Sequence, residues 1–339
     1  MTASPLRLRL DGAALVDNWR TLDRMSGHAA CGAAVKADGY GLGAREVVRR
    51  LAAAGCRDFF VATWAEAEDL TDLGVPVSVL HGVRAEDPRD AVFARPVLNT
   101  PEQVRRWKPT GRVCDVMVDT GMNRLGLAIA DVASGLLDGL TIDTLMSHLA
   151  CSDEEVAMNA RQRDALAGLA GRTSARRLSL ANSAGIGLGS DYAFDLTRPG
   201  LSLYGGAQRP ELAAIRQVAT PEAEILQRRT VRAGETVGYG ATWTASADTE
   251  VATLNLGYAD GFLRCFSDKG VALADKRELP VIGRVSMDLI AIDVSAAPDL
   301  GEGDWVAISY ALPETAAASG LSQYELLTGL GQRYDRVWG

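Results

Sequence analysis

The side chain best suited to chemistry in this sequence is that of Lys36, which directly follows a short hydrophobic run. The run 33–35 leads into Lys36, and a glycine-rich turn after it holds Tyr40. A lysine at the end of a buried strand is costly unless it is paired or used chemically. Burial lowers the pKa of its ammonium group, which suits a lysine that forms a Schiff base or transfers a proton. For this stretch alone, a lysine that reaches out to solvent is the simpler alternative.

Two further polar side chains follow hydrophobic runs later in the chain. Arg124 lies in the turn 119–126 after the run 114–118, and His148 ends the run 144–148. An arginine in a tight turn suits a substrate carboxylate or a phenolate, because its planar fork of N–H donors matches such groups. A solvated arginine in a capped turn and a structural histidine are the simpler alternatives, and the pattern alone leaves both open.

Two turns rich in glycine and serine are candidates for a phosphate site. The stretch 181–185 contains Ser183, and the stretch 198–205 begins with Arg198 and Pro199-Gly200. Small polar groups and backbone N–H groups at a strand-to-helix turn suit a phosphate. Each pattern is common by itself, but two such turns together with a lysine and an arginine favour pyridoxal phosphate. Neither a GxGxxG nor a Walker sequence competes for this role.

The elements that position these residues follow a regular alternation. About eight short apolar runs, each expected to form a strand, alternate with helical patterns before residue 216. The expected strands are the lysine run and residues 58–63, 77–81, 96–99, 114–118, 144–148, 178–181 and 195–203. The expected helices are residues 13–25, 44–54, 64–73, 101–107, 129–137 and 155–170. This alternation predicts a (β/α)8 barrel with the polar residues on its catalytic face, where phosphate loops usually follow strands seven and eight.

The pattern changes beyond residue 216 to short strands separated by glycine-rich turns. The strand-like runs are residues 227–231, 249–256, 272–273, 279–282, 289–294 and 305–308, followed by a helical pattern at 322–330. We therefore expect two domains, a barrel over residues 1–216 and an all-β domain over residues 217–339. Tyr239 and Tyr258 each stand between small residues in turns of the second domain. They are available as acid/base groups or gates, although packing within the turns is the simpler alternative.

The composition excludes several classes of protein. The chain has 339 residues and a net charge of -8, which argues against binding nucleic acid or an anionic membrane. Its five scattered cysteines fit reduced thiols in the cytoplasm, and its three histidines argue against a histidine-built metal site. We read no signal peptide and no membrane span in the sequence.

Taken together, the motifs resemble those of the alanine racemase family. The matching stretches are AVKADGYGLGA, VDTGMNRLGL, SHLACSDE, LANSAG, RPGLSLYG, VGYGATW, LGYADGF and GRVSMD. The lysine motif is shared with other barrel-type pyridoxal phosphate proteins, whereas the whole ordered set is specific. The resemblance implies a (β/α)8 barrel followed by a β-domain, pyridoxal 5'-phosphate as cofactor, no metal, and a head-to-tail homodimer with shared active sites.

The resemblance also implies roles for individual residues. Lys36 holds the cofactor as a Schiff base and is one acid/base group, and Tyr239 of the partner subunit is the opposite one. Arg198 bonds the pyridine nitrogen and, because a guanidinium hardly ever loses its proton, keeps that nitrogen unprotonated. The cofactor-binding positions are Lys36, Tyr40, His148, Ser183, Arg198, Gly200 and Leu201, with His148 also orienting the catalytic tyrosine. The substrate-binding positions are Arg124, the backbone N–H of Met287 and the gate Tyr258, with Arg264, Arg284 and Asp153 further out.

This chain departs from the family pattern at two positions. Many members carry a lysine that becomes carbamylated and steadies the arginine of the VDTGMNRLGL motif, and this chain has Met117 there. Arg124 is therefore expected to lack that anionic partner. Trp338 stands where the family often has a tyrosine that contacts the phosphate or lines the entrance.

The expected activity is the interconversion of L-alanine and D-alanine in the cytoplasm, which supplies D-alanine for peptidoglycan. A racemase of the same fold for serine or for a broader set of amino acids is the nearest alternative, since one hydroxyl group changes binding by only about 1–3 kcal/mol. A pyridoxal phosphate decarboxylase would be longer and would carry its own glycine-rich and cysteine-bearing motifs. A non-catalytic carrier of the cofactor would leave the tyrosines of the β-domain without a role.

Overall fold

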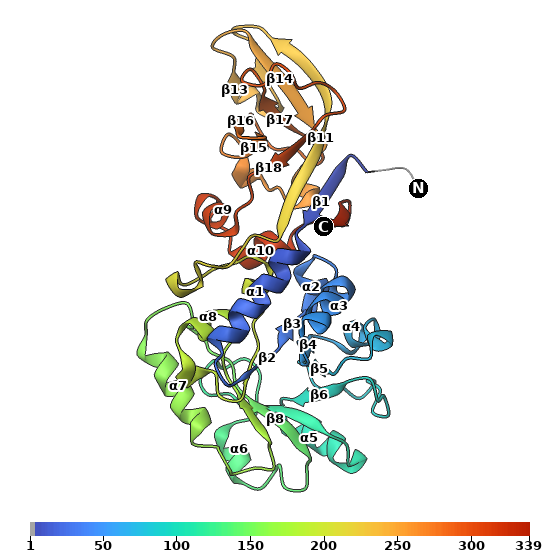
Figure 1. Cartoon of the computed structure of the whole chain (residues 1–339), viewed down its shortest axis with the longest axis vertical. Helices are drawn as coiled ribbons and strands as arrows, with labels where there is room; N and C mark the ends of the chain where they lie inside the picture. Colours follow the sequence, from blue (N-terminus) through green and yellow to red (C-terminus); the bar gives the residue numbers. More distant parts are fainter. Residues whose placement is uncertain (1–3) are drawn as a thin grey trace. The chain divides into compact units, whose positions relative to one another are not determined.

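The computed structural model describes residues 4–339 and divides them into two compact units (Figure 1). One unit comprises residues 14–216, and the other comprises residues 217–339 together with the N-terminal residues up to Ala13. The N-terminal strand β1 (Leu6–Leu10) therefore lies outside the barrel to which we had assigned residues 1–216. It pairs with β11 (Ala219–Val231) and β19 (Asp335–Trp338), because its alternating leucines are completely buried in that sheet.

The unit 14–216 is a closed barrel of parallel strands, as the sequence predicted. Its strand order is β2-β10-β9-β8-β7-β6-β5-β4-β3. A single interrupted strand closes the ring, since β2 pairs with β10, β3 pairs with β4, and only Gly32 lies between β2 and β3. The strands are β2 (Ala30–Cys31), β3 (Ala33–Ala34), β4 (Phe59–Val61), β5 (Val77–Val79), β6 (Arg95–Leu98), β7 (Cys114–Met117), β8 (Ile142–Met146), β9 (Arg177–Ser179) and β10 (Leu196–Thr197).

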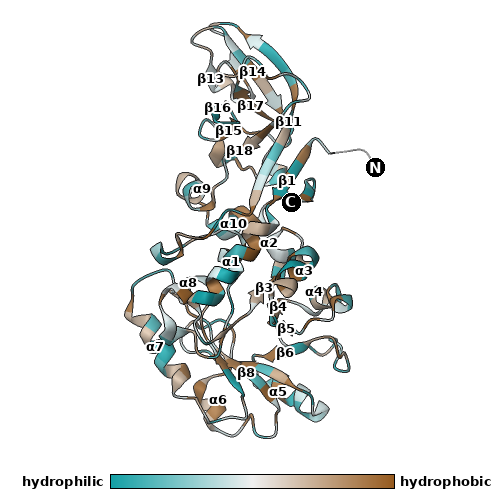
Figure 2. Ribbon diagram, viewed as in Figure 1, coloured by the Kyte–Doolittle hydropathy of each residue, from teal (hydrophilic) through white to brown (hydrophobic). Residues whose placement is uncertain are grey.

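Helices follow most of the strands of the barrel. Figure 2 shows hydrophilic and hydrophobic residues alternating along the helix α7. The helix α3 buries Val47, Val48 and Leu51 and leaves charged residues on its outer side, as expected for a helix that covers a sheet. The helices are α1 (Gly12–Met25), α2 (Lys36–Tyr40), α3 (Ala44–Ala54), α4 (Trp64–Glu68), α5 (Pro101–Trp107), α6 (Ile129–Ala133), α7 (Ala157–Ala167) and α8 (Ser183–Gly187). The predicted strand 195–203 is wrong in extent: β10 ends at Thr197, and Leu201–Tyr204 forms a 3-10 helix after Pro199-Gly200.

A network of ion pairs fills the amino-terminal end of the barrel. Arg95 lies at the start of β6 and contacts Asp115 of β7 and Asp143 of β8, each at 2.9 Å. Arg177 at the start of β9 contacts the same Asp143 at 2.6 Å and Asp58 at 2.7 Å. Buried charges are tolerated when each is paired in this way. These charges are paired with one another, although Arg177 Nε has no hydrogen-bond partner, so the opposite end of the barrel is the better candidate for a site.

The other unit is built on a sheet that is antiparallel except for the parallel pair β1–β19, in agreement with the predicted all-β domain. Its order is β14-β17-β16-β15-β18-β11-β1-β19, and the long strand β11 also pairs with β14. A register shift between Ile225 and Gln227 allows β11 to change partners along its length. The remaining elements are β12 (Thr236–Val237), β13 (Trp243–Thr244), β14 (Thr249–Leu254), β15 (Val271–Ala274), β16 (Arg277–Ile282), β17 (Ile290–Asp293), β18 (Trp305–Ile308), α9 (Leu312–Ser319) and α10 (Gln323–Thr328).

Two searches of residues 4–339 gave negative results. None of the helices there is long and apolar enough to cross a membrane. No group of three or more histidine, cysteine, aspartate or glutamate side chains within the same residues could hold a metal ion.

Candidate active site

The polar residues singled out in the barrel follow the carboxyl ends of its strands. Lys36 follows β3, Arg124 follows β7, His148 follows β8, Ser183 follows β9 and Arg198 follows β10. Because these strands run parallel, all five residues lie at the same end of the barrel. The structure thus places the predicted barrel residues around one mouth.

Lys36 begins a short left-handed turn. The backbone φ angles of Ala37, Asp38 and Tyr40 are 53°, 53° and 58°, and that of Gly39 is 62°. A left-handed conformation costs roughly 1–2 kcal/mol for each residue with a side chain, so the turn must be held by its surroundings. It places the lysine at its first residue and Tyr40 at its last.

The ammonium group of Lys36 is half-buried and has no ion pair or hydrogen bond with any described residue. Burial lowers its pKa, the positive charge of Arg124 lowers it further, and the Glu66 carboxylate opposes both. A lysine that is partly desolvated and lacks a direct counter-ion loses its proton more readily, which suits a nucleophile or a base.

Arg198 is almost completely buried beneath this mouth. Its terminal nitrogens donate hydrogen bonds to Ser179 Oγ and to the backbone oxygen of Ser147, and its guanidinium lies 5.9 Å from the centre of the Phe60 ring. Burial lowers its pKa to about 10, and the negative charge of Asp115 opposes that shift. Nε donates to no acceptor among residues 4–339. The N–H of Nε is therefore available for a bound molecule.

Three segments meet at a small anion cradle. Ser183 Oγ accepts hydrogen bonds from the backbone N–H groups of Gly200 at 3.0 Å and Ser202 at 3.1 Å. Tyr40 comes from the lysine turn and stacks on Tyr204 with ring centres 4.7 Å apart. The Tyr40 hydroxyl lies directly over Gly200, where an added Cβ would be only 2.2 Å away. The hydroxyl groups of Ser183 and Tyr40 therefore gather at one place, beside backbone N–H groups that already bind Ser183 Oγ, and a hydroxyl can donate to a phosphate oxygen.

His148 is partly buried and electrically neutral at physiological pH. Burial lowers its pKa to about 3, and the positive charges of Arg198 and Arg124 act in the same direction. Its loop is held by Gln162 of α7, which donates to the backbone oxygen of His148 at 2.9 Å and accepts from the N–H of Ala150 at 2.8 Å. The backbone of His148 is therefore held in place, and its imidazole is uncharged.

Arg124 is exposed, and no carboxylate of the described chain contacts its guanidinium. Met117, which stands where many family members carry the modified lysine, is buried in β7 opposite Met146 of β8. Two thioether side chains supply no negative charge. The lack of an anionic partner for Arg124 stays a prediction, and neither Met117 nor Met146 can supply one.

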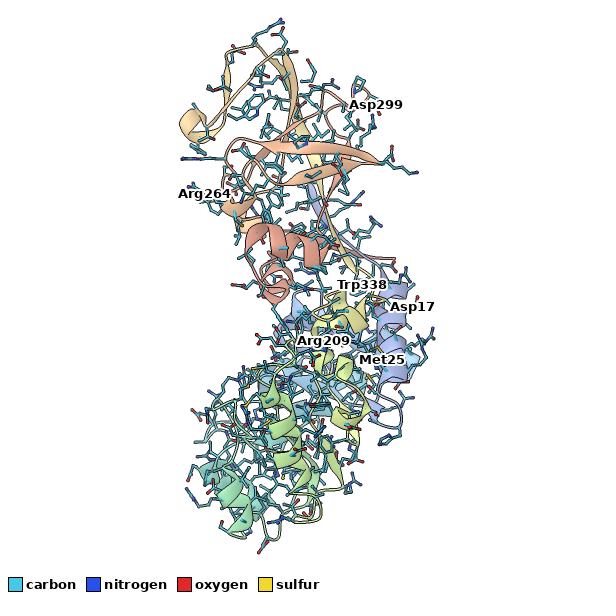
Figure 3. The ribbon with its side chains drawn as sticks, turned by 90° about the vertical axis from the view of Figure 1, so that its left-hand side faces the viewer. Asp17, Met25, Arg209, Arg264, Asp299 and Trp338 are labelled. Carbon is cyan, nitrogen blue, oxygen red and sulfur yellow. The ribbon has the colours of Figure 1, made fainter. Side chains whose placement is uncertain are left out.

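The predicted residues of the C-terminal unit lie on neighbouring exposed turns. Tyr239 is 68% exposed and Met287 is 53% exposed. The turn with Tyr258 is joined to the turn with Met287, since the N–H of Tyr258 donates to the backbone oxygen of Ser286 at 3.0 Å. Figure 3 labels Arg264, whose guanidinium lies 5.7 Å from the centre of the Tyr258 ring.

Arg333 cross-links these turns. It donates to both carboxylate oxygens of Asp260 and to Asp288, each at 2.7 Å. Asp260 is fully buried, and its carboxylate also accepts the N–H of Gly257 at 3.0 Å. One side chain near the C-terminus therefore joins the segment that carries Tyr258 to the segment that carries Met287.

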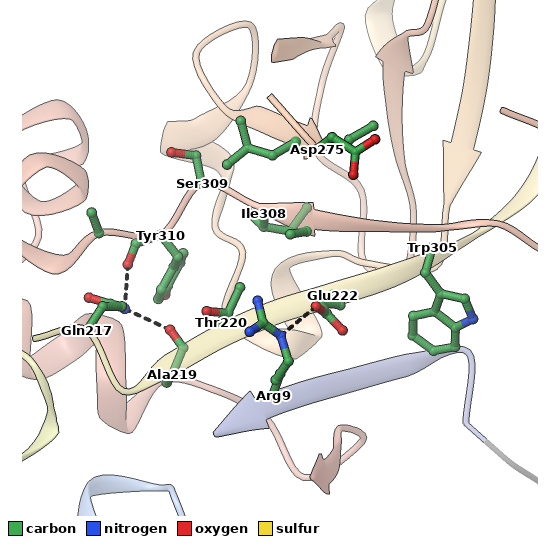
Figure 4. Close-up of a pocket in the computed structure, with 14 residues that line it drawn as sticks. Arg9, Gln217, Ala219, Thr220, Glu222, Asp275, Trp305, Ile308, Ser309 and Tyr310 are labelled. Carbon is green, nitrogen blue, oxygen red and sulfur yellow. Dashed lines mark hydrogen bonds and ion pairs between the residues drawn. The ribbon is translucent and has the colours of Figure 1, made fainter. Parts of the chain in front are cut away.

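A separate cavity of about 540 Å³ lies in the C-terminal unit (Figure 4). Its charged lining residues include Arg9 and Glu222, which pair with each other at 2.9 Å. Gln217 donates to the backbone oxygens of Ala219 and Tyr310 at 2.7 and 3.0 Å. No lysine or histidine of the described chain lines this cavity, so it is not the candidate active site.

The barrel mouth fits pyridoxal phosphate. That cofactor needs an amine for its aldehyde, a partner for its ring nitrogen and a cradle for its phosphate. Lys36, the spare N–H of Arg198, and the group formed by Tyr40, Ser183 and Gly200 match these needs in turn. Fold and site together define a barrel-type enzyme that depends on pyridoxal phosphate.

Comparisons with known proteins identify the family. Models of the alanine racemase N-terminal and C-terminal domains match residues 10–208 and 218–338. The chain is 42% identical to the alanine racemase of Rhodospirillum rubrum, over 98% of this chain and 95% of that protein. It is 40% identical to the biosynthetic alanine racemase of Agrobacterium fabrum, over 99% and 94% of the two chains. The chain belongs to the alanine racemase family.

Solved structures agree with this assignment. The crystal structure of alanine racemase from Bartonella henselae, which has covalently bound pyridoxal phosphate, superposes with a TM-score of 0.90 and 32% identity over the whole of both chains. The biosynthetic alanine racemase of Pseudomonas aeruginosa gives a TM-score of 0.86 and 30% identity, over 99% of this chain and 100% of that one.

Sequence reasoning missed three residues that support the site. Glu66 contacts the lysine turn, Gln162 holds the histidine loop, and Arg333 joins the turns of the β-domain. Only Glu66 had a local signal, because Thr63 and Glu66 match the capping-box pattern that begins a helix. The other two act on segments far away in the sequence and leave no local pattern.

Proposed function

We propose that this protein is an alanine racemase that transfers protons between two opposed groups. Lys36 is one of these groups, and Tyr239 of the partner subunit is the other. The observation that carries the proposal is the half-buried Lys36 without a counter-ion, in one barrel mouth with the anion cradle and the buried Arg198. Membership of the alanine racemase family sets the substrate class.

The residues of this chain divide the work of binding and proton transfer. Pyridoxal phosphate, when bound, spreads the negative charge that remains on the substrate when its α-proton is removed. Lys36 Nζ, with its lowered pKa, takes the proton from D-alanine, and the Tyr239 hydroxyl oxygen takes it from L-alanine on the other face. The opposite group returns a proton in each case. Such general acid/base help contributes on the order of 10²–10⁴-fold to the rate.

Arg198 and His148 set the charge around this chemistry. Arg198 keeps its proton even with a lowered pKa and donates a hydrogen bond from Nε. The pyridine nitrogen that would accept this hydrogen bond therefore stays unprotonated. That arrangement weakens the electron sink and limits side reactions such as transamination. His148 is neutral, so it can orient the catalytic tyrosine by a hydrogen bond without adding charge.

The substrate carboxylate is bound by Arg124 and the backbone N–H of Met287, and Tyr258 gates the entrance. Arg124 has no carboxylate partner in the described chain and is available for this role. The exposed side chains of Tyr239, Met287, Leu263 and Leu289 support a homodimer, because large hydrophobic groups gathered on adjoining turns mark an interaction surface. A partner subunit covers these side chains, and Tyr239 enters the active site of that subunit.

The product D-alanine is used for peptidoglycan, and the enzyme works in the cytoplasm. The five cysteines of the described chain are all free thiols, which fits a reducing compartment.

Incubation of the purified protein with pyridoxal phosphate and L-alanine in D₂O tests the proposal. We expect D-alanine to form with deuterium at the α-carbon, as measured by chiral chromatography and mass spectrometry, and the Lys36→Ala variant to be inactive. L-Serine in a parallel reaction tests the broader specificity. Release of carbon dioxide, or α-deuterium uptake without any D-alanine, would contradict the assignment.

A further inference from the structure

The carboxylate of Glu66 joins the lysine turn to the end of a neighbouring strand. Its Oε1 accepts a hydrogen bond from the N–H of Ala37 at 2.8 Å. Its Oε2 accepts from the N–H groups of Ala62 at 2.6 Å and Thr63 at 3.2 Å, just after β4. One half-buried side chain therefore satisfies three backbone donors from two segments of the barrel mouth.

Helix capping explains only one half of this arrangement. Thr63 Oγ1 accepts the N–H of Glu66 at 3.3 Å, and Glu66 Oε2 accepts the N–H of Thr63, so the pair forms a capping box at the start of α4. The bond from Ala37 to Oε1 spans 29 residues and serves no purpose in the cap.

The position of the Ala37 donor makes this contact relevant to Lys36. The N–H of Ala37 belongs to the planar peptide group that joins Ala37 to Lys36. The orientation of this N–H therefore fixes the orientation of the backbone at Lys36, from which the lysine side chain extends. Within the turn that Lys36 begins, Ala37 is also the first residue with left-handed backbone angles, where the backbone is strained. Asp38 holds the far end of the turn by accepting the N–H of Ala44 at 2.8 Å, and Glu66 holds the start.

We propose that Glu66 is a positioning residue for Lys36. Its carboxylate fixes the peptide that follows the lysine against the end of β4, and so sets the direction of the Lys36 amine. The negative charge of Glu66 also opposes the effects of burial and of Arg124 on the lysine. The inference rests on the proposed function, because it takes Lys36 as the residue that holds the cofactor and moves a proton.

The Glu66→Gln variant tests the inference with little change of shape. Glutamine has one acceptor oxygen in place of two, so its NH₂ group must face either the Ala37 donor or the Ala62 and Thr63 donors. We expect kcat to fall by about ten- to a hundred-fold with KM nearly unchanged, as a small misplacement of a reacting group does. The affinity of the protein for pyridoxal phosphate should also fall, and the apparent pKa of the lysine in the pH profile of kcat/KM should decrease.

Two control variants separate positioning from helix capping. Thr63→Ala breaks the same capping box but leaves the bond between Glu66 and Ala37. Glu325→Ala breaks a similar box at the start of α10, where Glu325 Oε2 accepts the N–H of Ser322 at 2.8 Å and no distant N–H is bound. Both controls should lower the melting temperature of the holoenzyme and leave kcat, cofactor affinity and the pH profile as in the wild type.

The possible results for Glu66→Gln and the wild type each test the inference. If Glu66→Gln lowers only the melting temperature, as the controls do, Glu66 is a helix cap and the inference is wrong. If Glu66→Gln does not fold, Glu66→Asp keeps the charge but is one methylene too short to span both segments, and it should show the loss of kcat with a smaller pKa change. If the wild type has no racemase activity, the proposed function fails, whereas the cofactor affinities of the variants still test the contact.

Discussion

The Tyr40 hydroxyl group occupies the space that a side chain at Gly200 would need. An ideal Cβ on Gly200 would lie 2.2 Å from Tyr40 Oη and 2.9 Å from the carbon that bears it. Tyr40 cannot easily move aside, because its ring is buried and stacks on Tyr204. The two residues lie in the segments that follow β3 and β10, and together they define the anion cradle.

We therefore expect Gly200→Ala to displace the Tyr40 hydroxyl and weaken the binding of pyridoxal phosphate. A loss of about ten-fold in affinity corresponds to about 1.4 kcal/mol, a modest value for one displaced hydrogen bond. Titration of the protein with the cofactor, followed by its absorbance, measures the change. Gly168→Ala is the control, since a Cβ there meets nothing closer than 3.4 Å. Equal affinities in both variants would show that Tyr40 does not contact the phosphate.

The depressed pKa of His148 predicts that stability falls in acid. The pKa of histidine in an unfolded chain is about 6.5, whereas burial lowers that of His148 to about 3. Between these two values the unfolded chain binds a proton that the folded chain does not, so the free energy of unfolding decreases as the pH falls. His148→Asn should make that decrease less steep between neutral pH and about pH 4.

Urea unfolding of the wild type and His148→Asn at several pH values measures the difference between their slopes. His28→Asn serves as the control, because His28 is exposed and its replacement should leave the slope unchanged. Parallel curves for all three proteins would mean that His148 takes up a proton in the folded protein as readily as in the unfolded chain.

The cross-link made by Arg333 predicts an effect on substrate binding as well as on stability. Arg333→Ala leaves the buried Asp260 without its bidentate partner. Because Arg333 is itself partly exposed, we expect a loss of about 1–3 kcal/mol in the free energy of unfolding, less than for a fully buried pair. The KM for alanine should rise, since the turn with Met287 is held through Asp288.

Chemical unfolding and steady-state kinetics measure the two effects of Arg333→Ala separately. Arg232→Ala removes an exposed ion pair with Asp248 in the same unit and should change neither quantity appreciably. If Arg333→Ala lost stability at an unchanged KM, the cross-link would be structural only.

Local patterns in the sequence were enough to predict most of the fold. The helices 44–54 and 101–107 and the strand 305–308 agree with the structure to the residue. In α5 the signals are Thr100 as the N-cap, which accepts the N–H of Gln103, and Pro101 at the first helical position. The placement of β1 in the C-terminal sheet could not be predicted, because its partners lie more than two hundred residues away.

The same distinction applies to the site. Lys36, Ser183 and Arg198 could be proposed from the sequence because each stands in a motif directly after a strand. Glu66 and Arg333 act through hydrogen bonds to distant segments. The sequence around Glu66 indicates only a helix cap, and the sequence around Arg333 indicates only a polar segment near the C-terminus. Residues that hold other parts of the site in place through contacts with distant segments could therefore not be predicted from the sequence.

The proposed sharing of active sites between subunits predicts that two inactive variants restore activity when mixed. Lys36→Ala and Tyr239→Phe should each abolish most of the activity. In a mixed dimer, Lys36 from one subunit meets Tyr239 of the partner subunit, so one of the two sites is intact. Random pairing of equal amounts makes half of the dimers mixed, which gives about a quarter of the wild-type activity.

Unfolding and refolding the two variants together, followed by assays of both reaction directions, measures this recovery. The matched control is a mixture of Lys36→Ala with a Lys36→Ala/Tyr239→Phe double variant, which contains no intact site in any pairing and should stay inactive. Tyr239 is 68% exposed in the single chain, so its replacement should not disturb the fold. Failure of the first mixture to regain activity, with dimers present by light scattering, would mean that both groups of a site come from one chain.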